Sequence, residues 1–141
     1  FFGLSAMHTK RDMLRAVMEG VAYSLRDCVE VCREMGVSVS DMMACGGGGT
    51  SALWRQMLAD LYGCSVKTVT SKEGPALGVA ILAMVGAGMY DSVPEACQAV
   101  IRTKQVQEPI PEQIPVYDRC YQMYRSLYPA MRNSFKALAK L

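Results

Sequence analysis

Residues 43–54, with the sequence MACGGGGTSALW, join a short apolar segment to the start of an amphipathic one through four consecutive glycines. Glycine loses more conformational freedom on folding than any other residue, so four in a row require a structural or functional reason. Residues 41–45 have the composition of a short buried strand, and residues 51–62 carry apolar side chains at helical spacing before Gly63. The stretch therefore predicts a strand that turns directly into a helix.

Such a turn leaves the first N–H groups of the helix without a partner and with partial positive charge. Glycines would let a phosphate or a ribose approach the backbone without meeting a Cβ atom, which predicts a nucleotide or anion site. The alternative is a tight structural turn capped by Thr50 or Ser51, for which one or two glycines would suffice. Neither the P-loop nor the dinucleotide-binding fingerprint fits, because no lysine follows Gly49 and Ser51 replaces the third glycine of GxGxxG.

A long amphipathic helix is predicted before the glycines, over residues 9–35, where Thr9 and Asp12 resemble a capping box. Apolar residues recur there at steps of three and four, and we expect the face that they form to be buried. These residues are Met13, Val17, Val21, Leu25, Cys28, Cys32 and Met35.

After the second helix, residues 65–70 alternate and are rich in β-branched side chains, which predicts a strand. Helices are predicted over residues 75–87 and 92–102, and the proline-bearing residues 105–115 are expected to form an extended surface connection. This order of elements indicates an α/β domain. Two strands are too few for a complete sheet, so we expect further strands from sequence before Phe1 or from a partner chain.

Apolar and aromatic residues near the C-terminus are spaced by alternating steps of four and three. They are Tyr117, Tyr121, Tyr124, Tyr128, Met131, Phe135 and Leu138. Pro129 lies within this helical pattern, and we expect a kink or a break near Tyr128. The face either packs onto the domain or forms a coiled-coil contact with a partner.

With 141 residues, 51% of them apolar, the chain is long enough to bury the core of one domain. Its net charge of +2 and its dispersed basic residues argue against a nucleic-acid partner. No apolar run is long enough for a membrane span and no signal-peptide pattern opens the sequence, so we expect no membrane partner and a cytoplasmic protein. The cysteines are then expected as thiols, with Cys28 and Cys32 buried as small apolar residues. No metal site is predicted, since His8 is the only histidine.

The glycines belong to a longer pattern. GGGGTSALWRQMLAD, over residues 46–60, closely resembles the adenosine-side motif GGGAxSxxWRQxLAD of the FGGY carbohydrate kinases. EGPALGVA, over residues 73–80, resembles the EGxALGAA segment of that family, and FGLSAMHTKRD, over residues 2–12, is similar to its GLxxxHTRADLxRA helix entry. YRSLYP, over residues 124–129, looks like part of its closing helix. These matches follow the order of the family and extend over nearly the whole chain.

The resemblance implies the later part of the second of two ribonuclease H-like, actin-like ATPase domains, with helices packed on a small sheet. The N-terminal, sugar-binding domain would be absent from this chain. It also implies a mechanism in which a sugar hydroxyl, deprotonated by a catalytic aspartate, attacks the γ-phosphate of ATP bound with Mg²⁺. The implied cofactors are therefore ATP and Mg²⁺, and the implied partner of this chain is an adenine nucleotide.

The resemblance can be carried over to few residues. The glycines would pass under the nucleotide, and the start of the following helix would face the adenosine. The implied nucleotide-binding residues are Gly47, Gly48, Gly49, Ser51 and Ala52. Gly49 stands where the family often has alanine, and Ala52 offers only its backbone where some relatives have a polar side chain. Residues 73–75 would line or support the same pocket.

No catalytic residue is assigned, and Asp12, Asp41, Asp60 and Asp91 are interpreted as cap, loop or surface positions. We therefore expect this chain alone to be inactive as a kinase. The alternative function is an interaction or dimerisation module derived from a sugar kinase. A homodimer is expected in either case, since a partial sheet leaves unpaired backbone groups and apolar surface.

Overall fold

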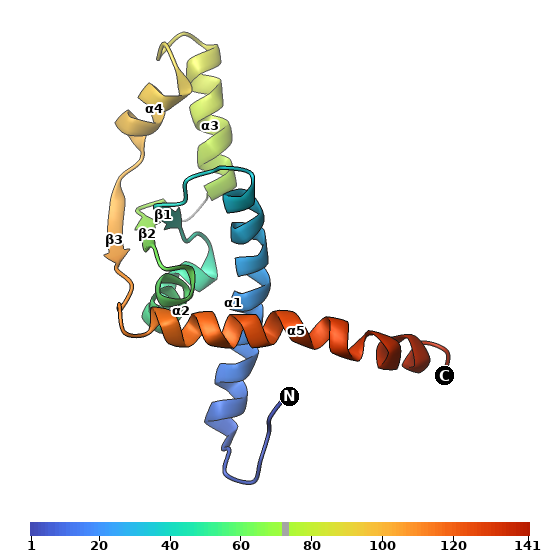
Figure 1. The fold of residues 1–141 in the computed structure, drawn as a ribbon. Helices are drawn as coiled ribbons and strands as arrows, with labels where there is room; N and C mark the ends of the chain where they lie inside the picture. The colour runs from blue at the N-terminus through green and yellow to red at the C-terminus, as the bar shows by residue number, and fades with distance from the viewer. Residues whose placement is uncertain (72–73) are drawn as a thin grey trace. The chain divides into compact units, whose positions relative to one another are not determined.

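The computed structural model describes residues 1–71 and 74–141, and these residues form five α-helices and three β-strands (Figure 1). The chain divides into two compact units, which we describe separately. The first unit contains Phe1–Val39, Asp60–Gly63 and Pro109–Leu141. The second unit contains Ser40–Ala59 and Cys64–Glu108, and it includes the whole sheet and the glycine stretch.

The sheet of the second unit has the strand order β1-β2-β3. Strands β1 (Asp41–Met43) and β2 (Ser65–Val69) are parallel, with Met42 opposite Val66, and Lys67 Nζ lies 3.0 Å from Asp41 Oδ2 across the pair. Both strands were predicted from the sequence, and both are confirmed. A helix connects them, which is the usual way for a chain to join two parallel strands.

Strand β3 (Thr103–Gln107) overlaps the segment that was expected to be an extended connection, so that prediction is wrong for residues 105–107. It pairs antiparallel with β2, and the pairing contains an irregularity at Thr68 and Val69. Its sequence, TKQVQ, has little apolar alternation. Its backbone groups form hydrogen bonds with β2, and this pairing rather than a buried apolar face makes the segment a strand. The chain therefore supplies a third strand itself.

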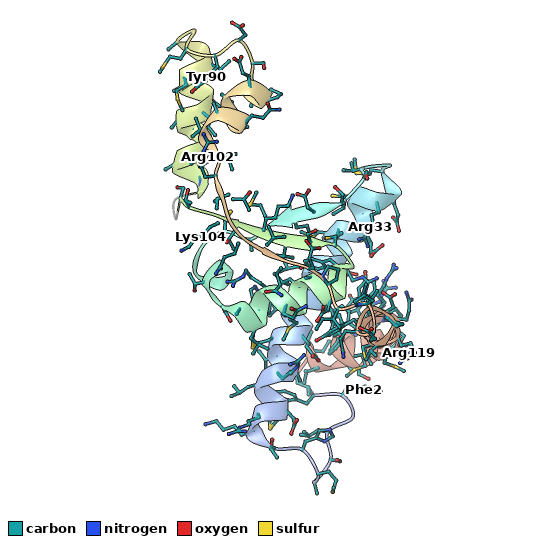
Figure 2. All side chains as sticks on the ribbon, turned by 90° about the vertical axis from the view of Figure 1, so that its left-hand side faces the viewer. Phe2, Arg33, Tyr90, Arg102, Lys104 and Arg119 are labelled. Atoms are coloured by element: carbon teal, nitrogen blue, oxygen red, sulfur yellow. The ribbon has the colours of Figure 1, made fainter. Side chains whose placement is uncertain are left out.

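Three helices belong wholly or largely to the second unit, α2 (Ala52–Tyr62), α3 (Gly74–Gly86) and α4 (Val93–Val100), and all three were predicted. Ser92 caps α4, because its hydroxyl accepts the N–H of Glu95 at 3.4 Å, and the Glu95 carboxylate accepts the N–H of Asp91 at 3.0 Å. Helix α3 packs against α4, and Tyr90 lies in the loop between them (Figure 2).

The first unit is built on α1 (Lys10–Glu34) and α5 (Ile114–Leu138), which cross each other (Figure 1). Tyr23 of α1 lies against three tyrosines of α5, with ring centroids 5.4 to 6.4 Å away. Burial raises the pKa of Tyr23 and of Tyr121 above the ordinary tyrosine value, and the hydrogen bond that Tyr121 donates to Asp27 adds to its shift. These tyrosines are therefore neutral packing groups at pH 7.

The apolar face predicted for α1 is exposed rather than buried. Val17, Val21 and Leu25 are 54%, 50% and 44% exposed, and Cys28 and Cys32 are also exposed, which corrects the expectation that these thiols are buried. The buried residues of α1 are Ala22, Tyr23, Arg26 and Val29. The stripe stays exposed because α5 contacts the face of α1 that carries these buried residues, whereas no described residue covers the stripe.

Helix α5 continues through Pro129, so of the two predicted alternatives the break is wrong, and the kink stays a prediction. Proline removes one backbone donor, which would leave the carbonyl of Arg125 without its helical partner, but both residues are exposed and water can hydrate that carbonyl. Tyr117 and Tyr121 are buried, which confirms packing for the first half, whereas residues 128–141 are exposed. Among the described residues, every helix is too short or too polar to cross a membrane.

Candidate functional site

The four glycines connect β1 to α2, and Gly47–Thr50 form a short 3₁₀ turn, η1. Gly46 precedes this turn with φ of 70° and ψ of −163°, a conformation open almost only to glycine. Its carbonyl accepts the N–H of Gly49 at 3.2 Å. The first glycine is therefore needed for the direction of the backbone.

Two further glycines lie close to other parts of the chain. A Cβ atom on Gly49, which is buried, would lie 2.8 Å from the carbonyl oxygen of Ala44 just after β1. Alanine here, as in the family motif, would require the end of β1 to shift. A Cβ atom on Gly48 would lie 3.2 Å from Nε1 of Trp54, the only tryptophan of the chain. The close approach at both positions is thus explained by the protein itself.

Gly47 is exposed and, like Gly46, has no atom within 4 Å of the place where its Cβ would be, but it lacks the positive φ that Gly46 needs. Its N–H group is at the start of η1, where amides have no acceptor within the turn. Its carbonyl accepts the hydroxyl of Thr50 at 2.7 Å, which fixes the peptide. Gly47 is therefore the position at which a ligand could approach the backbone of this turn.

Ser51 and Ala52 lie where α2 begins. The Ser51 hydroxyl oxygen accepts the N–H of Trp54 at 3.2 Å, and its carbonyl accepts the N–H of Arg55 at 3.0 Å, so Ser51 caps the helix from within the chain. Ala52 is exposed. The structure brings all five residues of the sequence hypothesis into one turn, and their contact with a nucleotide stays a prediction.

Arg55 is a residue of this site to which the sequence analysis gave no role. It is 6% exposed, and its Nη1 donates to the carbonyl of Gly49 at 2.7 Å. Its Nε has no hydrogen-bond partner among the described residues. One feature of the sequence could have indicated that Arg55 is buried, namely its position between Trp54 and Met57. In the structure, the helix that carries these three residues buries most of its side chains.

An apolar groove of about 380 Å³ lies in the same unit, between β1, β2, α3 and α4. Cys45, the residue before the glycines, lines it together with Gly74, whose ideal Cβ position is 3.5 Å from the Cys45 sulfur. The expectation that residues 73–75 line or support the pocket thus has a structural counterpart at Gly74. Glu73 lies outside the described residues.

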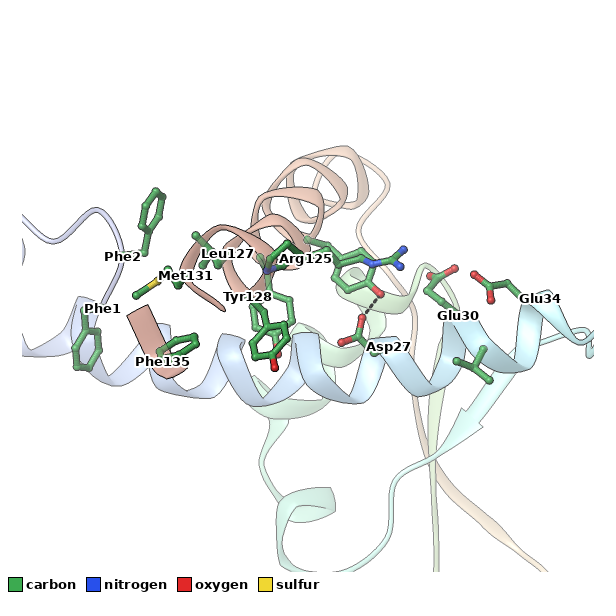
Figure 3. A pocket seen from close by; sticks show the side chains of 14 residues that line it. Phe1, Phe2, Asp27, Glu30, Glu34, Arg125, Leu127, Tyr128, Met131 and Phe135 are labelled. Atoms are coloured by element: carbon green, nitrogen blue, oxygen red, sulfur yellow. Dashed lines mark hydrogen bonds between the residues drawn. The ribbon is translucent and has the colours of Figure 1, made fainter. Parts of the chain in front are cut away.

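A larger groove, of about 970 Å³, is found in the first unit between α1 and α5 (Figure 3). Phe1, Phe2, Tyr128 and Phe135 are among its lining residues, and the Tyr121 hydroxyl donates to Asp27 Oδ1 at 2.5 Å along one side. None of the predicted nucleotide-binding residues lines it.

Asp12 and Asp60 have structural roles. The Asp12 carboxylate accepts the N–H and the hydroxyl of Thr9, each at 2.7 Å, and these hydrogen bonds lower its pKa. Asp60 is buried rather than superficial, which corrects that interpretation, and it accepts the N–H of Ile110 at 2.7 Å. In the part of the chain that the structure describes, no group of three or more His, Cys, Asp or Glu side chains could hold a metal ion.

Comparisons with known proteins agree with this fold. Xylulose kinase of Staphylococcus epidermidis (strain ATCC 35984) is 37% identical over 128 residues, which cover 91% of this chain and 26% of that protein. Ribulokinase of Halalkalibacterium halodurans is 35% identical over 132 residues, which cover 89% of this chain and 23% of that protein. The crystal structure of xylulose kinase from Rhodospirillum rubrum superposes with a TM-score of 0.85 and 32% identity, covering 96% of this chain and 28% of that one.

The chain thus spans about a quarter of the length of the relatives it matches. The structural likeness confirms the predicted fold class, part of an actin-like ATPase domain with helices on a small sheet. The model of the C-terminal domain of the FGGY family of carbohydrate kinases matches residues 1–87, which is more than half of the chain. The chain therefore belongs to the FGGY family of carbohydrate kinases.

Proposed function

We propose that this chain provides the adenosine side of the nucleotide site of a sugar kinase, which converts D-xylulose to D-xylulose 5-phosphate with ATP. The match to the FGGY C-terminal domain carries the proposal, since the matched residues 1–87 contain the entire glycine turn. The named relatives include xylulose kinases and a ribulokinase, and the xylulose kinases support xylulose as the sugar.

In phosphoryl transfer, catalysis comes mainly from positioning the reactants and from neutralising the charge that develops on the phosphoryl group. This chain would contribute to positioning through the exposed backbone of Gly47 and the start of α2. The geometry supports this role, because the open amide end of η1 lies in one unit with an apolar groove. Mg²⁺ would neutralise phosphate charge when it is bound with ATP, and no residue of this chain is assigned to it.

Binding of ADP to the 141-residue chain tests the nucleotide role. Trp54 lies against Gly48, so its fluorescence reports on the turn without a label. We expect ADP to change this fluorescence with a Kd of about 0.1 to 1 mM, as for half of a cleft. Gly47→Val should weaken binding at least tenfold, about 1.4 kcal/mol, because its side chain would occupy the approach to the backbone.

Gly86→Val is the matched control, because it makes the same change at another exposed glycine with no atom near its Cβ position. It should leave ADP binding unchanged. Gly48 is a poorer choice, since a side chain there would displace Trp54 itself. A folded wild-type chain that shows neither a fluorescence change nor a heat of binding with ADP would contradict the nucleotide role.

A chimera tests phosphoryl transfer. The matching segment of the Staphylococcus epidermidis xylulose kinase would be replaced by these 141 residues, and ADP formation with D-xylulose would be followed in a coupled assay. We expect kcat within about tenfold of the parent enzyme, whereas Gly47→Val in the chimera should raise KM for ATP much more than it lowers kcat. A chimera that folds and binds ADP without transferring phosphate to D-xylulose would contradict the proposed activity.

The interaction module is the second candidate function, and the exposed apolar stripe of α1 favours it. Val17 and Val21 on this stripe are each at least half exposed. The two functions differ at the glycine turn, because only the kinase role requires ADP to bind there. The homodimer stays a prediction under both.

A further inference from the structure

The glycine turn accepts a hydrogen bond from a buried, positively charged side chain. Arg55 is 6% exposed, and its guanidinium stays protonated in proteins. Its one described hydrogen bond goes to a neutral carbonyl, that of Gly49, while Nε has no partner. A charge buried in this way is unfavourable unless an opposite charge lies nearby.

Arg26 in the first unit shows the contrast. It is similarly buried, at 9% exposure, and it too has one unpartnered nitrogen. However, its charge is paired with two carboxylates, Asp118 at 2.6 Å and Glu30 at 3.1 Å. Among the described residues, no carboxylate forms an ion pair with Arg55. The turn thus lies against a positive charge that this part of the chain does not neutralise.

We propose that Arg55 is a positioning residue that makes the glycine turn favour phosphorylated over neutral ligands. It would act in two linked ways, by fixing the carbonyl of Gly49 and by adding a buried positive charge to the partial charge of the η1 and α2 amides. The ligand itself would meet the backbone of Gly47, and Arg55 would lie behind that contact. This inference rests on the proposed nucleotide role and adds the residue that sets the preference for adenosine phosphates over adenosine.

The order of affinities tests it. We expect the wild-type chain to bind ADP at least about tenfold more tightly than adenosine, with AMP between them. Arg55→Met keeps most of the volume of the side chain and removes its charge. This variant should bind ADP about tenfold more weakly than the wild-type chain, and its loss of affinity for AMP should be smaller. Its affinity for adenosine should change by less than about twofold. Arg55→Lys keeps the charge without the planar fork, and it should retain the preference for ADP.

Arg102→Met is the matched control, since it removes an exposed arginine of the same unit that donates to the carbonyl of Gln98. It should leave the ratio of ADP to adenosine affinity unchanged. All four chains would be titrated by Trp54 fluorescence, with circular dichroism to confirm folding. Arg55→Gln is the second neutral variant if Arg55→Met does not fold.

The outcomes separate the two proposals. If the wild-type chain binds ADP and adenosine equally well, Arg55 does not set ligand class, whatever the variants do. If the neutral variants lose affinity for ADP and for adenosine by the same factor, Arg55 is only a structural support. In both cases the nucleotide role remains. If the folded wild-type chain binds no adenosine phosphate, the proposed function fails and this inference fails with it.

Discussion

Replacing Tyr121 by alanine is expected to lower the free energy of unfolding by about 4 kcal/mol, the largest effect that we anticipate. Tyr121 is 1% exposed and is among the largest fully buried side chains. Its ring lies 6.3 Å from that of Tyr23 and 6.5 Å from that of Tyr124, and the Arg26 guanidinium lies 4.4 Å from its centroid. Alanine would leave a cavity at the crossing of α1 and α5 and remove all of these contacts.

Tyr121→Phe is the matched control. It keeps the ring and loses the hydroxyl that donates to Asp27, so it should cost only about 1 to 2 kcal/mol. Urea unfolding followed by circular dichroism measures both values, and the cooperativity should remain the same. Equal destabilisation by the two variants would contradict the view that packing of the ring holds the two helices together.

The second large effect is expected at Arg26, where Arg26→Met should lower the free energy of unfolding by about 2 to 3 kcal/mol. The arginine joins α1 to α5 through Asp118, and methionine would leave that carboxylate without its partner. The loss stays below that of a fully buried pair, because the Asp118 side chain is 48% exposed and Glu30 keeps a contact with Arg33 at 2.8 Å. The same urea experiment measures it.

Lys67→Met is the control for Arg26, since it breaks the ion pair with Asp41, whose two side chains are 31% and 44% exposed. Exposed pairs contribute little, so this variant should change stability by less than about 1 kcal/mol. Asp118→Asn in the Arg26→Met background should have almost no further effect, because the two side chains act together. Additive losses would show that Arg26 stabilises the unit independently of Asp118.

Sequence patterns predicted the part of the fold around the glycines well, because each element there has a local cause. The β-branched residues of β2, the apolar spacing of α2 and the capping pair of Ser92 and Glu95 all depend on neighbours in sequence. Strand β3 was missed because its polar residues acquire strand structure only by pairing with β2. No local signal encodes such a pairing.

The candidate site was located correctly in sequence as one turn, but the reasons for its glycines were only partly predicted. Periodicity cannot show that Gly48 lies under Trp54 or that Gly49 approaches Ala44, since both are contacts of the folded chain. It also cannot show that Arg55 is buried, because composition places arginine on the surface. In α1, periodicity identified a real apolar stripe but not which face α5 contacts.

The exposed second half of α5 has a thermodynamic consequence for recognition. Residues 128–138 are exposed and are held as a helix by their own backbone bonds, and an isolated helix of this length is marginal in water. A molecule that covers Tyr128, Met131 and Phe135 must therefore order any frayed residues of this segment. The conformational entropy lost on ordering costs about 1 to 2 kcal/mol per residue, and the binding contacts must offset it. Coupled ordering of this kind favours reversible association over tight association.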